Sequence, residues 1–476
     1  MKLRRNPFST LTIQALQWLD KLSSSLNPSF VLAIILIFGL SHGFTGSYFR
    51  VASDFYWKDV QKSQPSSAQI YAGLYSLPSI MKPIWGLLTD VFPVMGYRRR
   101  PYFVAAGVIG GASAAIVTVF RQLPAVMGLG CLIGVETAKA IADVTMDACI
   151  AKKSVEVKAL ATDMQSLGSF CSSLGALVGY SSSGFLVHSL GAQGAMGFLA
   201  IPPASMLVLG FLFYERKITR HHSTNIGVRL KTTMEEMLRT MRLPQVWRPS
   251  LYMYLSLALN ISTHEGQFYW YTHPTAGPAF SQEFVGVVYA VGALGSVIGV
   301  IVYHKLLRDL PFRNILFLAQ LLYGVSGMLD LIFILRWNLK LGIPDPLFVI
   351  LEEGVLRLIA RVRWVPMMVL SSRLCPLGIE GTFFALLMCI DSLGTLSAKW
   401  GGGLLLHLFH VSRTDFSNLW LAVFIRNVLR LGTLALIFLV PGNAGQVDVL
   451  VPCSDGSTKE FGKGGGYLPV DADIKV

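Results

Sequence analysis

The chain has 476 residues, of which 53% are apolar and only 14% are charged. Soluble domains carry about 25% charged residues, so a chain this long and this poor in charge is expected to be a membrane protein rather than a large soluble enzyme. The formal net charge is +13, but the bases recur between apolar segments instead of forming one patch, which favours a membrane topology over nucleic-acid binding.

The first segment, residues 1–28, is basic and polar and is predicted to be cytosolic. No apolar run with a small-residue cleavage site follows it, so a cleaved secretory signal is not expected, while an organelle transit peptide remains an alternative. The six cysteines include no C-x-x-C pair, which indicates neither a disulfide framework nor a zinc site. We therefore expect no metal and no cofactor.

Twelve segments contain the roughly 20 largely apolar residues that a membrane-spanning helix requires. In chain order they cover residues 29–49, 67–92, 101–120, 123–150, 159–188, 193–215, 248–271, 282–306, 313–335, 344–375, 379–409 and 418–441. With both chain ends in the cytosol, most of the 40 lysines and arginines fall on the cytosolic side. This asymmetry predicts an integral multi-pass protein with its N- and C-termini inside.

The longest internal connection, residues 216–247, divides the twelve segments six and six. The pattern predicts an N-terminal bundle over 29–215, a C-terminal bundle over 248–441 and a cytosolic tail over 442–476. Within the basic connection, "RLKTTMEEMLRTM" places apolar residues on one helical face. We expect an amphipathic helix on the cytosolic leaflet there, rather than a docking motif.

Short similarities link corresponding places in the two bundles. "KAIADV" at 139–144 resembles "RLIARV" at 357–362, and "GFLVH" at 184–188 resembles "GLLLH" at 403–407. Each match is short, but the members of both pairs lie six segments apart. Duplicated six-helix halves are the architecture of major facilitator transporters. The predicted fold class is therefore an all-α membrane protein with twelve helices in two pseudo-symmetric halves.

The connection between the second and third segments, "GLLTDVFPVMGYRRRPYF", combines an acid with three bases. Asp90 lies near the cytosolic end of the second segment, and the bases are Arg98, Arg99 and Arg100. The stretch resembles the major facilitator loop signature G-x-x-x-D-R-x-G-R-R, except that Val91 stands where arginine is usual and the loop is longer. The arginines can simply fix the topology. Topology does not explain the aspartate, so these four residues are also a candidate conformational switch.

The fourth segment carries Glu136, Lys139, Asp143 and Asp147 at spacings that place them on one helical face. A charge at mid-helix costs about 2.5–3.5 kcal/mol on insertion scales, so such residues usually face a polar interior and mark function. Lys139 and one acid can neutralise each other for packing alone. The functional alternative is that Asp143, with or without Asp147, carries a coupling proton.

The seventh segment ends in "THEGQFYWYTHP", where Glu265 is predicted to lie inside the membrane and is a further candidate for proton coupling. Aromatic residues follow at positions 268–271. They form either a belt at the outer interface or a platform on which a flat ligand stacks. His264 and His273 lack a partner at metal-ligand spacing, so no metal site is expected.

Charged residues are concentrated in the last three segments. They are Glu352, Glu353, Arg357, Arg361, Arg363, Asp391, Lys399, Arg426 and Arg430. Bases outnumber acids in this set, which favours an anionic ligand, because arginine binds carboxylates bidentately. Arg357 and Arg361 are the preferred carboxylate ligands. Glu353, one turn before Arg357, and Lys399 complete the predicted substrate site.

A structural interpretation of the same charges stays open. Arg426 and Arg430 can snorkel, or they can pair with Asp391 or Glu353. In the eighth segment, "GALGSVIG" places small residues four apart, which favours close helix packing over ligand contact.

Several strings inside the predicted segments are long enough to be specific. They include "YSLPSIMKPIWGLLTDVFPVMGYRRRPYF", "AIADVTMDACIA" and "SGMLDLIFILRWNLKLGIPD". They resemble the folate–biopterin transporter family, especially its plant members, from about the first segment through the twelfth. The resemblance implies a twelve-helix transporter of folates or pterins with proton coupling. Folate's glutamate carboxylates would then bind Arg357 and Arg361, and Asp143 would alternatively accept hydrogen bonds from the amino-pyrimidine edge of a pterin.

The sequence therefore predicts a secondary active transporter whose partners are a folate or pterin, protons and the lipid bilayer. No nucleic acid and no obligate protein partner is expected. No H-E-x-x-H, G-x-S-x-G or P-loop pattern indicates an enzyme. The alternatives are a carrier of another organic anion and a non-transporting scaffold or sensor, which the in-helix charges argue against. Both the plasma membrane and an organelle envelope fit the pattern.

Overall fold

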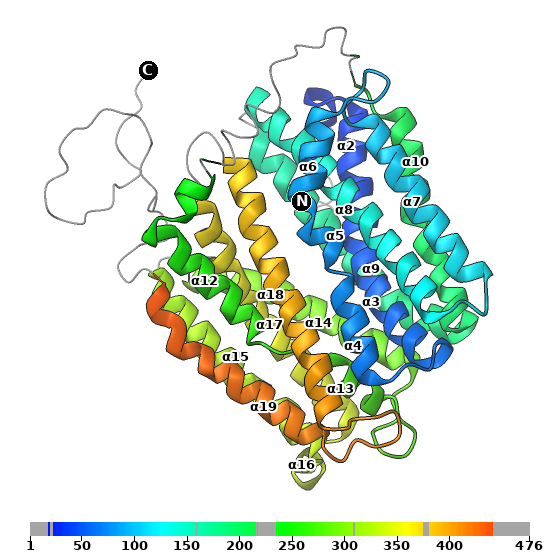
Figure 1. The fold of residues 1–476 in the computed structure, drawn as a ribbon, viewed down its shortest axis with the longest axis vertical. Coiled ribbons are helices and arrows are strands. Elements are labelled where there is room, and N and C mark those ends of the chain that lie inside the picture. Colours follow the sequence, from blue (N-terminus) through cyan, green and yellow to red (C-terminus); the bar gives the residue numbers. More distant parts are fainter. Residues whose placement is uncertain are drawn as a thin grey trace, which may run out of the picture. The chain divides into compact units, whose positions relative to one another are not determined.

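The computed structural model describes residues 18–19, 22–157, 160–215, 217, 235, 237–307, 310–374 and 380–440. The predicted tail 442–476, most of the predicted connection 216–247 with its amphipathic helix, and residues 1–17 lie outside this part. The described chain is helical (Figure 1), and its β-type pairing is limited to an isolated bridge between Val94 and Tyr97.

The N-terminal half begins with helical segments that continue into one another. α2 (Pro28–Ile34) runs through a π-helical stretch (Ile35–Phe44) into α3 (Thr45–Phe55), and a second π-helical turn (Tyr56–Val60) follows. The further helices are α4 (Pro65–Leu74), α5 (Leu77–Ile80), α6 (Lys82–Val91), α7 (Arg100–Val119), α8 (Ala125–Glu156), α9 (Ala161–Ala195) and, after a 3₁₀ turn (Met196–Ala200), α10 (Ile201–Leu212).

The C-terminal half contains long helices joined by short connections. They are α12 (Pro244–Ala258), α13 (His264–Tyr271), α14 (Gln282–Val302) with a π-helical end (Tyr303–Leu307), α15 (Phe312–Ile334), α16 (Trp337–Lys340), α17 (Asp345–Arg373), α18 (Glu380–Leu408) and α19 (Leu419–Gly432) with a 3₁₀ end (Thr433–Leu439).

Proline explains where many of these helices begin. A proline occupies the first or second position of α2, α4, α5, α7, α10, α12 and α17. At these positions a backbone N–H would have no acceptor within the helix, so proline loses no hydrogen bond by lacking one. Its fixed φ already suits a helix. Asn27 and Ser281 add side-chain caps, because their oxygens accept the backbone N–H of Ser29 and Phe284.

Eight helical stretches are long and apolar enough to cross a membrane. One of them, Asp163–Leu212, covers most of the fifth and sixth predicted segments and changes direction at Gly191, whose φ is 73°. The second predicted segment is divided among α4, α5 and α6, and the seventh is broken between α12 and α13. The all-α membrane fold is confirmed, while the count of twelve crossings stays a prediction.

Contacts divide the described chain into two compact units. The first contains Ile84–Gly179 together with described residues up to Arg50 and from Ala195 to the central connection. The second contains Val51–Pro83, Tyr180–Gly194 and the described residues of the C-terminal half. Each unit has its own apolar core, so each is stabilised by burial of its own hydrophobic surface.

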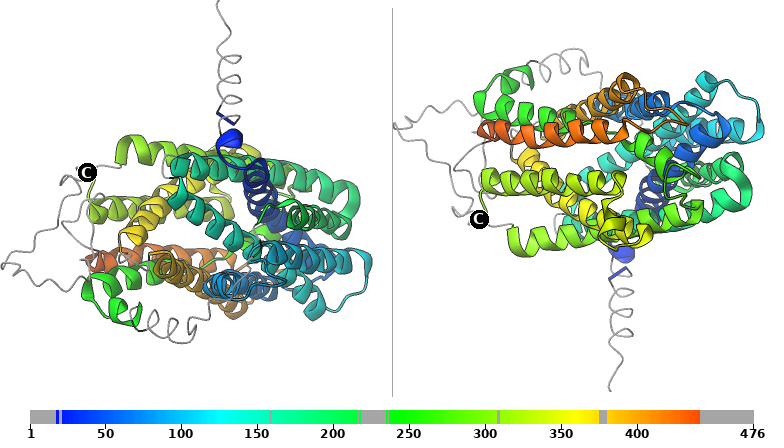
Figure 2. Two further views of the ribbon diagram at one scale, coloured as in Figure 1. Left: turned by 90° about the horizontal axis from the view of Figure 1, so that it is seen from above. Right: turned by 90° about the horizontal axis from the view of Figure 1, so that it is seen from below.

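In the second unit, α14 packs along α17, and α15 packs along α19 (Figure 1); Figure 2 gives two further views of these helices. Gly295 permits the close approach of α14, because a Cβ atom at that position would lie 2.4 Å from the main-chain oxygen of Gly354. The predicted close packing of the eighth segment is confirmed. This contact holds α17, which carries most of the predicted substrate ligands, against α14.

Candidate functional site

The charged face of α8 lies in the first unit. Lys139 Nζ is 2.5 Å from Glu136 Oε2, so the pairing considered for this lysine is present. Asp143 is 3% exposed, and its Oδ2 lies 3.1 Å from Nδ1 of His42. Asp147 is exposed on the same helix. The sequence analysis missed His42 because it stands 101 positions from Asp143, and no spacing rule connects the two.

The three consecutive arginines act through their main chain as well as their charge. The carboxylate of Glu215 accepts hydrogen bonds from the backbone N–H groups of Arg98, Arg99 and Arg100 at 2.8–3.1 Å. Because α7 begins at Arg100, this anion stands at a helix N-terminus, where the helix dipole favours negative charge. The contact fixes the start of α7 within the first unit.

The predicted switch is described only in part. The Arg99 guanidinium donates from Nη1 to Oγ1 of Thr89 at 2.6 Å, which connects the loop to the end of α6. Arg100 donates from Nε to the main-chain oxygen of Gly210 at 3.0 Å. The side chain of Asp90 lies outside the described part of the structure, so its role in a switch stays a prediction.

The face of α17 brings two of the predicted substrate ligands together. Arg357 Nε donates to Oε1 of Glu353 at 2.6 Å. Arg361 stacks on Trp364, with its guanidinium carbon 4.4 Å from the ring centroid. The buried Nε of Arg361 has no hydrogen-bond acceptor among the described residues. Lys399 lies on α18 instead, and its Nζ donates to a main-chain oxygen of α4 at 2.9 Å.

Arg426 is the centre of a buried polar cluster in the second unit. It is 3% exposed and forms an ion pair with Asp330 on α15. Its Nη1 also donates to Gln267 at 3.0 Å and to Thr263 at 3.1 Å. Gln267 in turn donates to the other oxygen of Asp330 at 2.9 Å. The buried charge is therefore both paired and hydrogen-bonded, as such charges require.

The sequence analysis found Arg426 but proposed the wrong partners. The structure pairs it with Asp330 rather than with Asp391 or Glu353. Asp330 stands alone in an apolar string, and 96 positions separate it from Arg426. The break between α12 and α13 is also part of the cluster, since it carries Thr263. A hydropathy pattern detects neither the break nor the pairing.

A pocket lies next to this cluster within the second unit. Its lining is Tyr271, Phe280, Val285, Val288, Tyr289, Asp330, Val349, Glu352 and Glu353. Glu352 is 4% exposed, and neither of its oxygens meets an N–H or hydroxyl donor in the described chain, while the carboxyl group of Asp330 lies beside it. The pocket thus combines aromatic rings with an acceptor that the described residues leave unsatisfied.

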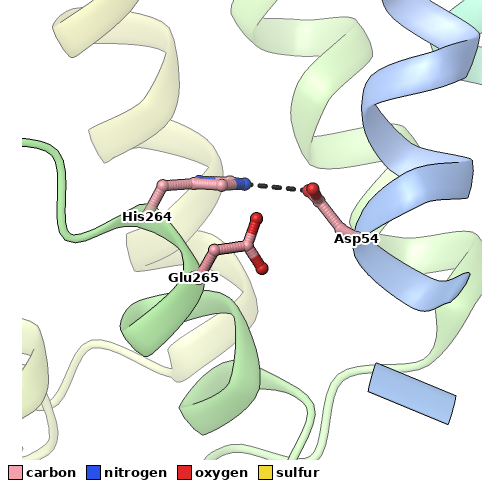
Figure 3. Close-up of side chains that lie close together, drawn as sticks. All are labelled: Asp54, His264 and Glu265. Carbon is pink, nitrogen blue, oxygen red and sulfur yellow. Dashed lines mark hydrogen bonds and ion pairs between the residues drawn. The ribbon is translucent and has the colours of Figure 1, made fainter. Parts of the chain in front are cut away.

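A second polar cluster joins α3 to the start of α13. Figure 3 shows His264 and Glu265 directed toward Asp54, with His264 Nε2 2.8 Å from Asp54 Oδ2. One ligand atom from each residue lies within 4.8 Å of the others, and Asp54 and Glu265 are buried. A nitrogen and two carboxylates are donors that can hold a zinc-type ion. The sequence analysis considered only nearby partners for His264, and Asp54 lies 210 positions away.

Solved structures show which fold this architecture has. The nucleoside transporter NupG matches with a TM-score of 0.65 and 12% identity, over 86% of this chain and 98% of that chain. A D-xylose-proton symporter matches with a TM-score of 0.61 and 15% identity, over 87% and 98%. The chain therefore has the all-α fold of major facilitator-type transporters.

Sequence relatives narrow the class to one family. The model of the BT1 family matches residues 42–457, and the chain belongs to the BT1 family. "Probable folate-biopterin transporter 6" of Arabidopsis thaliana is 59% identical over 95% of this chain and 90% of its own length. "Folate-biopterin transporter" of Synechocystis sp. is 30% identical over 88% and 83%.

These findings confirm the predicted family resemblance to plant folate–biopterin transporters. The protein is an integral membrane transporter, and the names of its relatives identify transporters rather than enzymes. A transporter of this family implies a small-molecule substrate. The candidate site must therefore be judged by what it can bind and release, not by bond-breaking chemistry.

Proposed function

We propose that the protein is a secondary active transporter that carries folate or biopterin-type pterins together with protons by alternating access. The relatives named above as folate–biopterin transporters support this substrate class. The structural observation that carries the proposal is the charged face of α17, where Glu353, Arg357 and Arg361 are spaced one turn apart.

This face has the chemistry to bind a carboxylate. Arg357 is paired with Glu353, and an incoming carboxylate can replace that partner without leaving the guanidinium unpaired. Arg361 still has a buried N–H with no acceptor among the described side chains. Folate ends in a glutamate with two carboxylates, one for each arginine. Lys399 on α18 is a further proposed substrate ligand, and Asp143 on α8 stays the alternative acceptor for the amino-pyrimidine edge of a pterin.

Buried carboxyl groups are the proposed carriers of the coupled proton. Asp143 with His42 supplies a carboxylate–imidazole pair in the first unit, and Glu265 stands beside Asp54 and His264 in the second. Histidine changes charge near physiological pH, so such pairs exchange protons at low cost. Asp147, exposed at the cytosolic end of α8 in the proposed topology, would pass the proton on.

Alternating access requires contacts that break and re-form. The proposed switch consists of Asp90 with Arg98, Arg99 and Arg100, and the arginine main chain is already held by Glu215. The proposed topology places both termini in the cytosol, with six-helix bundles at 29–215 and 248–441, in the plasma membrane or an organelle envelope. The predicted absence of an obligate protein partner belongs to the same proposal.

Uptake into proteoliposomes tests the substrate and the anion ligands together. Purified protein should import labelled folate and biopterin, and Arg357→Gln and Arg361→Gln should each weaken folate about tenfold while changing biopterin little, because only folate carries the glutamate. Arg121→Gln, in an exposed turn, is the matched control.

Two outcomes would contradict this assignment. Equal losses for folate and biopterin would remove the two arginines as ligands of the glutamate. Failure to import either compound, with uptake of a different organic anion by the same preparation, would replace the substrate class by the alternative considered above.

A further inference from the structure

Glu352 differs from the acids that surround it. Asp330 is paired with Arg426 and bonded to Gln267, and Glu353 is paired with Arg357. Glu352 is as deeply buried as Asp330, yet no N–H or hydroxyl donor of the described chain reaches either of its oxygens, and the polar group beside it is the carboxyl of Asp330. An unsatisfied buried polar group costs free energy, and a charged one costs more. Its position is explained if a donor arrives from outside the chain.

The side chains around Glu352 have the chemistry of a site for a flat ligand, and they must move apart to admit one, because the enclosed space is about 40 Å³. Glu352 shares its pocket with the rings of Tyr271, Phe280 and Tyr289. The rings of Tyr271 and Phe280 have their centroids 6.2 Å apart, and three valines line the rest of the pocket. Aromatic walls with few polar groups are typical of sites in which a planar ring binds and one or two hydrogen bonds fix its orientation.

The acidic groups in the pocket favour a ligand that donates hydrogen bonds. Glu352 lies beside the carboxyl group of Asp330, and Glu353 lines the same pocket. Apart from the hydroxyls of Tyr271 and Tyr289, the polar groups of the pocket are carboxyls, and a ligand edge with two N–H groups would satisfy both oxygens of one carboxylate. A pterin has such an edge, formed by its 2-amino group and the adjacent ring N–H.

We infer that Glu352 is the residue that recognises the amino-pyrimidine edge of the substrate, with Tyr271, Phe280 and Tyr289 as the walls for the pterin ring. This inference rests on the proposed function and deepens it, because it names the end of the substrate that the pocket binds. In this assignment Glu352, rather than Asp143, accepts the hydrogen bonds of the amino-pyrimidine edge. Arg357 and Arg361 on the same helix remain the ligands of the other, anionic end.

The test compares two rings that differ at one position. Pterin carries an amino group at carbon 2, and lumazine carries a carbonyl oxygen there. Equilibrium binding of both to the purified full-length protein should favour pterin by about tenfold or more, because the lumazine oxygen would face the Glu352 carboxylate. This comparison uses the wild-type protein and does not depend on the folding of any variant.

The substitution Glu352→Gln adds a second, independent measurement. The glutamine amide can donate to the lumazine oxygen while its own oxygen accepts the neighbouring N–H, so the preference should fall to about one or reverse. Glu283→Gln is the matched control, since this glutamate lies on α14, is more exposed and is not among the residues that line the pocket. It should retain the wild-type preference.

The outcomes separate this inference from the proposed function. A wild-type preference below twofold, or an unchanged preference in folded Glu352→Gln, overturns the role of Glu352 even if folate and biopterin are transported. A protein that binds neither ring overturns both the inference and the pterin assignment. A wild-type preference of about tenfold that falls to about one or reverses in Glu352→Gln, and that Glu283→Gln retains, supports both.

Discussion

At the scale of single residues, two buried acids of this transporter have partners far away in the sequence. Arg426 pairs with Asp330, and Asp143 contacts His42. Composition alone predicted that the in-helix charges mark the interior, because each is costly in lipid. It did not predict the partners, since pairing across helices depends on packing that a single sequence does not record. Two local pairs, Lys139 with Glu136 and Arg357 with Glu353, could be anticipated from their spacing.

Removing one partner of the Asp330–Arg426 pair is expected to destabilise the protein more than removing both. Asp330→Asn leaves Arg426 buried without its counter-charge and should lower the apparent unfolding free energy by about 3–5 kcal/mol. The double variant Asp330→Leu with Arg426→Leu removes both charges and should recover most of that loss. Thermal unfolding in detergent measures both, with Asp415→Asn in an exposed loop as the control.

A double variant that loses as much stability as the sum of its single substitutions would show that the two charges act independently. That result would contradict the pairing as the source of the stability.

Asp143 is expected to be needed for coupling rather than for folding. Asp143→Asn keeps the size of the side chain but removes its ability to release a proton, so accumulation driven by a proton gradient should fall to the level of empty liposomes. Exchange of substrate across the membrane at equal concentrations should continue, because no net proton movement is required. Asp415→Asn should leave both activities unchanged. Gradient-driven accumulation by Asp143→Asn would exclude it as the proton carrier.

At the scale of helices, α17 is the element on which the candidate site depends. It carries Glu352, Glu353, Arg357 and Arg361, and glycines of α14 hold it in place. Apolar length and proline positions predicted where most helices lie, and the glycine spacing predicted the close contact. The break between α12 and α13 was not predicted, because "LNISTHEG" contains no proline and its only glycine lies inside α13.

The glycine contact gives a direct test of this packing. Gly295→Ala would place a Cβ atom 2.4 Å from the oxygen of Gly354, so α14 and α17 must separate. The fraction of monodisperse protein in detergent and its melting temperature should both fall. Gly130→Ala on α8 is the matched control, since a Cβ atom there meets nothing within 4 Å. It should be neutral or slightly stabilising, because alanine favours helix by about 1 kcal/mol over glycine. Equal behaviour of the two variants would contradict the proposed role of Gly295.

At the scale of the whole molecule, the all-α fold and the family match both indicate a membrane transporter, and the low content of charged residues indicates a membrane protein. The residues 51–83 and 180–194 group with the C-terminal helices by contact, although they precede the central connection in the chain. Hydropathy and charge asymmetry could not predict this grouping, because they describe each segment in isolation. The division into two pseudo-symmetric six-helix bundles stays a prediction.

The central claim is that movement of a pterin or folate is coupled to movement of protons. It is tested most directly by sealing a pH-sensitive dye inside proteoliposomes and adding biopterin or folate outside, with no imposed gradient. We predict that the substrate enters and that the lumen acidifies in the same time course, and that empty liposomes show neither change. Entry of substrate with a constant internal pH would contradict proton coupling, and a lumen that neither acidifies nor gains substrate would contradict the proposed transport itself.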